Sequence, residues 1–212
     1  MLWRIPTGRL EAIPGEPEAV ILLLDISGSM ADDDYPPSRL EAMKEAAVKF
    51  IERKHTDSPD DQVGIITFGS SAEICCSLVP VRTGYHKLLN AVKAIEIKGT
   101  TEMVAGLKEA GRAIAPGWFR KVSVSRRIIL LSDGGHSGIG NPVKVAASLK
   151  AEGIIVECVG IGDRELLDED TLRKIASIHN KRGVLYRWIG DRENLERHFI
   201  EMSNKLVIKE GG

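Results

Sequence analysis

Oxygen-bearing side chains gather in three short turns of the sequence. The first turn is residues 25–29 (DISGS), directly after an apolar run. The second is residues 99–101 (GTT), ahead of a helical pattern, and the third is residues 132–134 (SDG), after another apolar run. Two carboxylates and several hydroxyls, without imidazole or thiolate, form a donor set that suits Mg²⁺ and does not suit zinc. The residue types therefore predict a site for a hard divalent cation.

Apolar runs show which strands must carry these turns. Residues 20–24 form a continuous apolar run, which is typical of a strand buried on both faces. Residues 62–68 and 73–78 are two strand-like runs whose link is so short that it predicts a hairpin, and hence one antiparallel pair. The remaining predicted strands are residues 127–131, 154–159 and 184–188.

Helical patterns alternate with these strands. Ser38-Arg-Leu-Glu41 is a capping-box pattern that predicts a helix start, and Pro142 after Asn141 predicts another. The predicted helices are residues 38–54, 84–95, 102–114, 142–152, 168–177 and 191–206. This alternation predicts an α/β fold: a doubly wound, mostly parallel sheet with one antiparallel edge strand and helices on both faces. Ligands bind such sheets beyond the carboxyl ends of the strands, where all three turns are expected.

In this order of elements the sequence resembles a von Willebrand factor type A (VWA) domain with a metal-ion-dependent adhesion site (MIDAS). The resemblance extends over about residues 19–206. The family's Asp-x-Ser-x-Ser, its threonine and its Asp-Gly match, in order, Asp25, Ser27, Ser29, Thr101 and Asp133. The sequence departs from the family at Thr100, which stands where the second glycine of Gly-Gly-Thr is usual.

The resemblance implies a cofactor and a kind of partner. It implies Mg²⁺, with Mn²⁺ or Ca²⁺ as alternatives, contacted by the serines and the threonine while the aspartates often act through water. Two aspartates only just neutralise a divalent ion, so a Glu or Asp carboxylate of a protein partner is expected to complete the octahedron at about 2.0–2.1 Å. The expected function is a non-enzymatic, Mg²⁺-dependent protein-interaction domain, accessory to an intracellular complex such as a ring-forming ATPase, a chelatase or a kinase-linked system.

Each turn also has an ordinary structural interpretation. Asp25 and Ser27 fit a simple turn, Thr101 fits a helix N-cap, and Asp133 with its glycine fits another turn. Taken singly these are the commoner roles, but their conjunction at one sheet edge favours the metal site. An alternative function is a Mg²⁺-dependent phosphotransferase or phosphatase with Asp25 as nucleophile. We rank it lower because Ser27 stands where the general acid/base carboxylate is needed.

Neighbouring residues suggest further roles that we weigh lower. Asp32 and Asp33 have a spacing similar to that in integrin beta subunits, which suggests an adjacent second metal ion; a solvated acidic loop is the favoured interpretation. His136 follows Asp133 by three residues and is expected to be an exposed loop histidine. Residues 117–127 mix aromatic and basic side chains, and a solvated loop is favoured there over a nucleic-acid patch.

Composition excludes several classes of partner. The 212 residues carry 29 Lys plus Arg against 30 Asp plus Glu, so binding of nucleic acid or anionic membrane through bulk charge is not expected. The longest apolar run, residues 19–24, is far shorter than the ~20 residues of a membrane span. The three cysteines form no CxxC pair, which indicates reduced thiols and a cytoplasmic protein. The expected organisation is a leader at 1–18, one domain at 19–207 and a tail at 208–212.

Overall fold

The central strand of the sheet is β1 (Glu18–Asp25), and every one of its residues is buried. The structure is a computed structural model that describes residues 17–115 and 124–205. β1 pairs in parallel with a neighbour on each side. The six-stranded sheet has the order β3-β2-β1-β4-β5-β8, and its other members are β2 (Gln62–Phe68), β3 (Ala72–Pro80), β4 (Ser125–Ser132), β5 (Ile154–Gly160) and β8 (Tyr186–Trp188).

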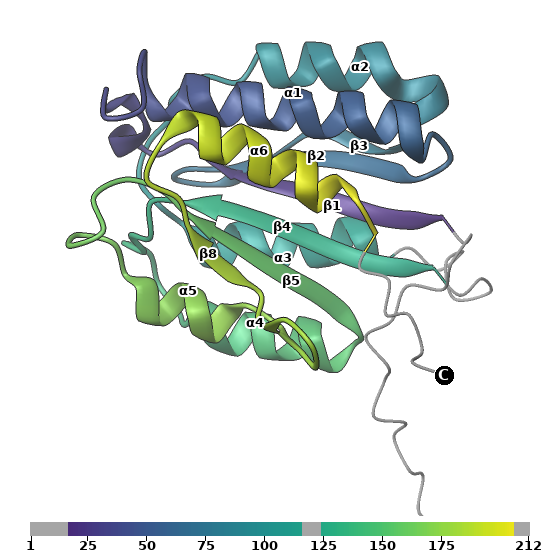
Figure 1. Ribbon diagram of the computed structural model, residues 1–212. Helices are drawn as coiled ribbons and strands as arrows, with labels where there is room; N and C mark the ends of the chain where they lie inside the picture. Colours follow the sequence, from purple (N-terminus) through teal and green to yellow (C-terminus); the bar gives the residue numbers. More distant parts are fainter. Residues whose placement is uncertain (1–16, 116–123, 206–212) are drawn as a thin grey trace, which may run out of the picture.

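Alternate side chains of β1 enter two separate cores, one on each face of the sheet. Val20, Leu22 and Leu24 pack on one face. Ile21 and Leu23 pack on the other. The helices that cover the first face are α1 (Arg39–Asp57), α2 (Val81–Lys93) and α6 (Arg192–Ser203), and those that cover the second are α3 (Met103–Ile114), α4 (Pro142–Ala151) and α5 (Glu169–Ile175) (Figure 1). The sheet is therefore sandwiched between two helical layers.

The predicted fold class is confirmed, including the antiparallel edge. β3 runs antiparallel to β2 at the edge, whereas the other pairs of the sheet are parallel. Both predicted helix starts have the expected caps. Ser38 Oγ accepts a hydrogen bond from Glu41 N at 3.2 Å, and Asn141 Oδ1 accepts one from Lys144 N at 3.2 Å.

Several predicted boundaries are wrong. α2 begins at Val81 rather than residue 84, because β3 runs to Pro80 and the chain turns into the helix at once. The predicted strand at 184–188 is divided: β7 (Gly183–Val184) pairs antiparallel with β6 (Ile178–His179) in a small second sheet, and only β8 joins the main one. α5 ends at Ile175, two residues early, and beyond it Ser177 bonds to the backbone of Val156 at 2.8 and 2.9 Å.

Other predictions fall on the ends of the chain. Residue 18 was assigned to the leader, but Glu18 begins β1. The rest of the predicted leader (except residue 17), the predicted tail at 208–212 and most of the aromatic and basic run lie outside the described residues. Within residues 17–115 and 124–205, none of the helices is both long and apolar enough to cross a bilayer.

A buried ion network occupies the amino-terminal edge of the parallel strands. Lys54 Nζ, from the last turns of α1, bonds to Glu18 and lies 2.6 Å from Asp61 Oδ2. Arg127, from β4, bonds to Glu18 Oε1 at 2.6 Å and to Glu157 Oε2 at 3.4 Å. All five side chains are less than a tenth exposed. The network therefore links the end of α1 and the start of β2 to the central strands of the sheet.

Candidate metal centre

The Asp25 carboxylate lies at the carboxyl end of β1 and is fully buried. Its Oδ1 accepts a hydrogen bond from Ser27 N at 2.9 Å, and its Oδ2 accepts one from Ser132 Oγ at 2.6 Å. The Ser132 hydroxyl also accepts from Gly134 N at 3.0 Å. Ser132 therefore ties the first turn to the third. The sequence placed this serine in the third turn but gave it no role, because a bridging hydroxyl leaves no spacing pattern.

Burial disfavours the ionised form of the Asp25 carboxylate. Its pKa is raised from 3.8 to about 6, chiefly by loss of hydration and to a lesser degree by the nearby charge of Asp133, while the hydrogen bonds from Ser132 and Ser27 oppose the shift. A divalent cation at this edge would stabilise the ionised form. The electrostatics of Asp25 are thus those of a group that gains from a metal ion.

The first turn brings two serine hydroxyls together. Ser27 Oγ and Ser29 Oγ lie 3.3 Å apart, with Ser27 buried and Ser29 exposed. Ser27 is the N-cap of a short 3-10 helix, η1 (Gly28–Ala31), and Ser29 lies within that helix. The sequence analysis missed η1. The buried side chain of Met30 anchors η1 in the core beneath. The turn therefore presents one hydroxyl from within the protein and one from its surface.

The second turn is fastened to the first by backbone hydrogen bonds. Gly28 N donates to Gly99 O at 3.1 Å, and Lys98 N donates to Ile26 O at 2.7 Å. Thr101 is largely buried, and it is not the N-cap of α3, since Glu102 holds that position without a side-chain cap. The capping interpretation of Thr101 is therefore wrong, and its hydroxyl remains free for another role at this edge.

The third turn packs on the second. Thr101 N donates to Ser137 Oγ, and Ser137 N donates to Thr101 O, both at 3.2 Å. His136 Nδ1 lies 3.2 Å from Thr101 O, and because a carbonyl can only accept, that nitrogen carries the proton. His136 is half-buried, so its predicted exposure is wrong. The sequence could not foresee this contact, which depends on how the loop after Asp133 folds back.

An arginine that the sequence analysis did not single out lies against the third turn. Arg39 Nη1 is 3.2 Å from Asp133 Oδ2. The same guanidinium contacts Asp34 and Asp32, two members of the acidic loop, and all three aspartates of that loop are exposed. Sequence reasoning used Arg39 only as a filler position in the capping box. Its signal was the acidic run seven to five residues earlier, which needs a nearby cation.

The donor set fits a hard cation. Three turns place Asp25, Ser27, Ser29, Thr101 and Asp133 at the carboxyl edge of the sheet. Within the described part of the chain, no three His, Cys, Asp or Glu side chains cluster as metal ligands would. A metal ion here would therefore depend on hydroxyl oxygens as much as on carboxylates, as Mg²⁺ accepts. The assignment of these five residues as ligands stays a prediction.

Residues 20–136 match the family model of the von Willebrand factor type A domain. The chain belongs to this family. The fission yeast 26S proteasome regulatory subunit rpn10 is 26% identical to this VWA chain over 165 residues, which are 77% of the chain and 65% of that protein. A UPF0353 protein of Mycolicibacterium paratuberculosis is 29% identical over 191 residues, 78% of the chain and 54% of that protein. The chain thus spans about half to two thirds of the length of these curated relatives.

Solved structures share the VWA fold. BatB from Bacteroides thetaiotaomicron superposes with a TM-score of 0.70 at 25% identity, covering 87% of this chain and 96% of that one. The SpRpn10 VWA domain gives 0.69 at 20% identity, covering 92% and 100%. Proximal thread matrix protein 1 from the mussel byssus, with a zinc-occupied MIDAS motif, gives 0.69 at 19% identity, covering 88% and 47%. The last two likenesses support the fold alone.

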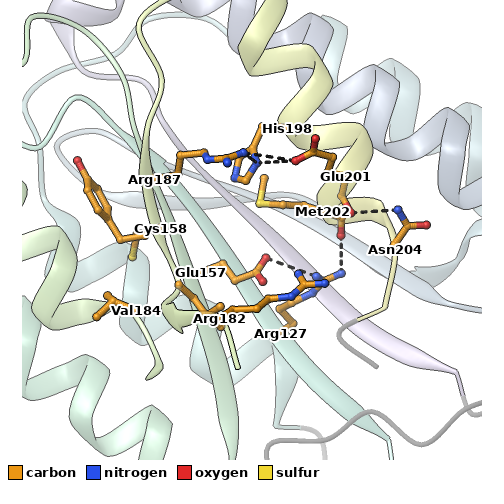
Figure 2. A pocket seen from close by; sticks show the side chains of 12 residues that line it. Arg127, Glu157, Cys158, Arg182, Val184, Arg187, His198, Glu201, Met202 and Asn204 are labelled. Atoms are coloured by element: carbon orange, nitrogen blue, oxygen red, sulfur yellow. Dashed lines mark hydrogen bonds and ion pairs between the residues drawn. The ribbon is translucent and has the colours of Figure 1, made fainter. Parts of the chain in front are cut away.

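A cavity of about 230 Å³ lies away from these turns, between α6 and the edge of the sheet. Arg127, Glu157 and Met202 line it, together with Arg187 and His198 (Figure 2). Arg127 belongs to the buried ion network at the other edge. Three arginines, Arg127, Arg182 and Arg187, line this cavity, and their positive charge disfavours a divalent cation, so it does not compete with the three turns as the metal site.

Proposed function

We propose that this VWA domain is an Mg²⁺-dependent protein-interaction domain. Ser27, Ser29 and Thr101 would hold the ion together with Asp25 and Asp133, and a Glu or Asp of a partner protein would complete its coordination. The observation that carries the proposal is the fastening of three oxygen-rich turns to one another at a single sheet edge, through Ser132 and the backbone of the first two turns.

Charge and access support a ligand from another protein. When bound, a divalent ion supplies a Lewis-acidic position that attracts an anionic oxygen, and two aspartates only neutralise it. Ser29 is exposed, so the rim of the site is open to a partner's side chain. The rpn10 relative is a regulatory subunit of a large assembly, which favours an adaptor role in a cytoplasmic complex. Neither nucleic acid nor membrane is a proposed partner.

The geometry of Asp25 weighs against the phosphotransferase alternative. A nucleophilic carboxylate must present a free oxygen to its substrate. The Asp25 side chain has no solvent-accessible surface through which a phosphate group could reach its oxygens, whereas its charge can stabilise a cation without direct contact. Ser27 also cannot replace the missing acid/base carboxylate near neutral pH. We therefore propose a non-enzymatic role.

Metal titration and partner capture test the proposal in sequence. Calorimetry with Mg²⁺ should give one site in the wild-type protein and none in Asp25→Asn, while Asp60→Asn, an exposed acid at the opposite edge, should bind as wild type does. Wild-type bait should then recover a protein from lysate in Mg²⁺ but not in chelator, and exchanging single acidic residues of that protein should abolish capture. Capture that is unchanged in chelator, or Asp25-dependent phosphatase turnover, would refute the proposal.

A further inference from the structure

The guanidinium of Arg39 is held beside the candidate metal centre by several carboxylates. Arg39 is the first residue of α1 and is only 8% exposed. Its Nε and Nη2 bond to the two oxygens of Asp34 at 2.7 Å each, a forked pairing that fixes the plane of the group. Its Nη1 lies 3.2 Å from Asp133 Oδ2 and 3.2 Å from Asp32 Oδ2. Arg39 therefore joins the acidic loop to the third turn.

The same guanidinium also reaches the first turn. Arg39 Nη1 donates to the backbone oxygen of Ser29 at 3.3 Å, so the group touches two of the five proposed metal-site residues. The turn after β5 packs against its other side, because a Cβ added to Gly162 would lie 2.8 Å from Arg39 Cζ. The cation is thus confined by three loops and has little room to swing away from the site.

We propose that Arg39 is a resident cation that sets the affinity of this edge for divalent ions, with Asp32 and Asp34 as its own counter-charges rather than ligands of a second ion. The inference rests on the proposed metal site. A fixed positive charge that shares Asp133 with the metal repels it, and a unit charge ~6 Å from a divalent ion in water-like surroundings changes affinity about tenfold. Arg39 is a positioning residue for Asp133.

Removing the positive charge of Arg39 and removing the negative charge of Asp34 should change Mg²⁺ affinity in opposite directions, and this contrast gives the sharpest test. Arg39→Gln should tighten Mg²⁺ binding about tenfold at low ionic strength, with a smaller gain in 0.5 M salt, since added salt screens the charge. Arg39→Lys keeps the charge, and its affinity should stay within about threefold of the wild type. Asp34→Asn removes a negative charge next to the site and should weaken Mg²⁺ binding, although Asp34 is not a proposed ligand. Arg82→Gln, which removes an exposed arginine at the opposite edge, is the matched control and should change nothing.

A second measurement separates electrostatic tuning from a merely structural role. Without metal, Arg39→Gln should lower the melting temperature, because Asp34 and Asp133 lose their shared cation, and Mg²⁺ should raise that temperature more than in the wild type. A lower melting temperature with unchanged Mg²⁺ affinity, or weaker affinity in Arg39→Gln, overturns the inference. Should Arg39→Gln fail to fold, Asp34→Asn decides the question alone: affinity equal to or above wild type overturns it. Absence of Mg²⁺ binding by the wild-type protein itself would instead overturn the proposed function.

Discussion

The two ends of β1 treat a buried acid in opposite ways. At the amino-terminal edge, Glu18 bonds to Lys54 and Arg127, so two cations face one carboxylate. At the carboxyl edge, the equally buried Asp25 receives only hydrogen bonds from neutral groups, Ser27 N and Ser132 Oγ. One strand therefore carries a carboxylate paired with two cations at its start and a carboxylate bonded to neutral groups at its end.

This difference separates stability from binding. A buried ion pair that is fully matched contributes to a single closed structure and offers nothing to a ligand. A buried carboxylate without a cation costs folding free energy, and that cost is recovered when a cation arrives. Arg39 shifts the balance only partly, because it contacts Asp133 at the rim and not Asp25 beneath. This imbalance supports the proposal that a cation binds at the carboxyl edge.

Removal of Lys54 should disrupt the buried ion network at the amino-terminal end of β1. Lys54→Met fills the space of the alkyl stem but leaves Glu18 and Asp61 without their shared ammonium, which should lower the free energy of unfolding by about 3–5 kcal/mol. Urea unfolding measures the loss. Lys49→Met, a half-exposed lysine on the same helix, should cost less than about 0.5 kcal/mol. Affinity for Mg²⁺ should stay unchanged, and a loss below 1 kcal/mol would show that the network is not matched as described.

Removal of the serine hydroxyls should act only on the candidate metal centre, at the carboxyl end of β1. Ser27→Ala combined with Ser29→Ala takes away two neutral oxygen donors, and Mg²⁺ affinity should fall about 100-fold, or about 2.7 kcal/mol. The free energy of unfolding in chelator should fall by only about 1 kcal/mol, the usual net worth of a hydrogen bond, since the hydroxyls contact each other and Ser27 also bonds to Asp25. Calorimetry and urea unfolding read the two effects. Ser148→Ala, on the surface of α4, is the control, and equal Mg²⁺ affinity in all three proteins would contradict the site.

The sequence predicts the fold well because its patterns are local. Continuous apolar runs mark the buried strands, and the three-residue link between β2 and β3 leaves no alternative to a hairpin. Asp25, Ser27, Ser29 and Asp133 follow from strand order, since the carboxyl ends of parallel strands must share an edge, whereas Thr101 lies between two helices and follows from the family resemblance. Boundaries fail where a tertiary contact decides them, as at Ser177, whose bonds to Val156 follow an early end of α5.

Partners that are distant in sequence are what patterns cannot supply. Arg39 meets Asp133 across 94 positions, and Ser132 meets Asp25 across 107. Both contacts exist only after the sheet has formed, so no spacing rule reveals them. Asp32 shows the consequence: the sequence allows it as a ligand of a second ion, although a solvated loop is favoured, and in the structure it faces Arg39. Residue type is enough to propose the donors, but it does not reveal the charged groups that surround them.

Protonation of Asp25 should sharpen the comparison in metal-free protein. Its pKa is about 6 in the folded protein against 3.8 for the ordinary group, so the folded state binds the proton more tightly than the unfolded state. The free energy of unfolding should therefore gain about 1 kcal/mol from this group as pH falls from 7 to 5. The measurement is urea unfolding in chelator, taken as the difference between wild type and Asp25→Asn. A difference that is independent of pH would contradict the unbalanced carboxylate.

The smallest effect should come from Glu157, the most exposed of the five side chains in the buried ion network. Glu157 touches Arg127 only at 3.4 Å and borders the cavity beneath α6 (Figure 2), and burial raises its pKa. Glu157→Gln should therefore change the free energy of unfolding by less than about 0.5 kcal/mol, because the charge it removes gains little from its partner. Glu18→Gln is the matched substitution in the same network and should cost several times more, since Glu18 bonds to both cations. Equal losses of unfolding free energy in the two variants would mean that each glutamate stabilises the network through its charge alone. The number of charges, rather than the pairing distances, would then distinguish the two ends of β1.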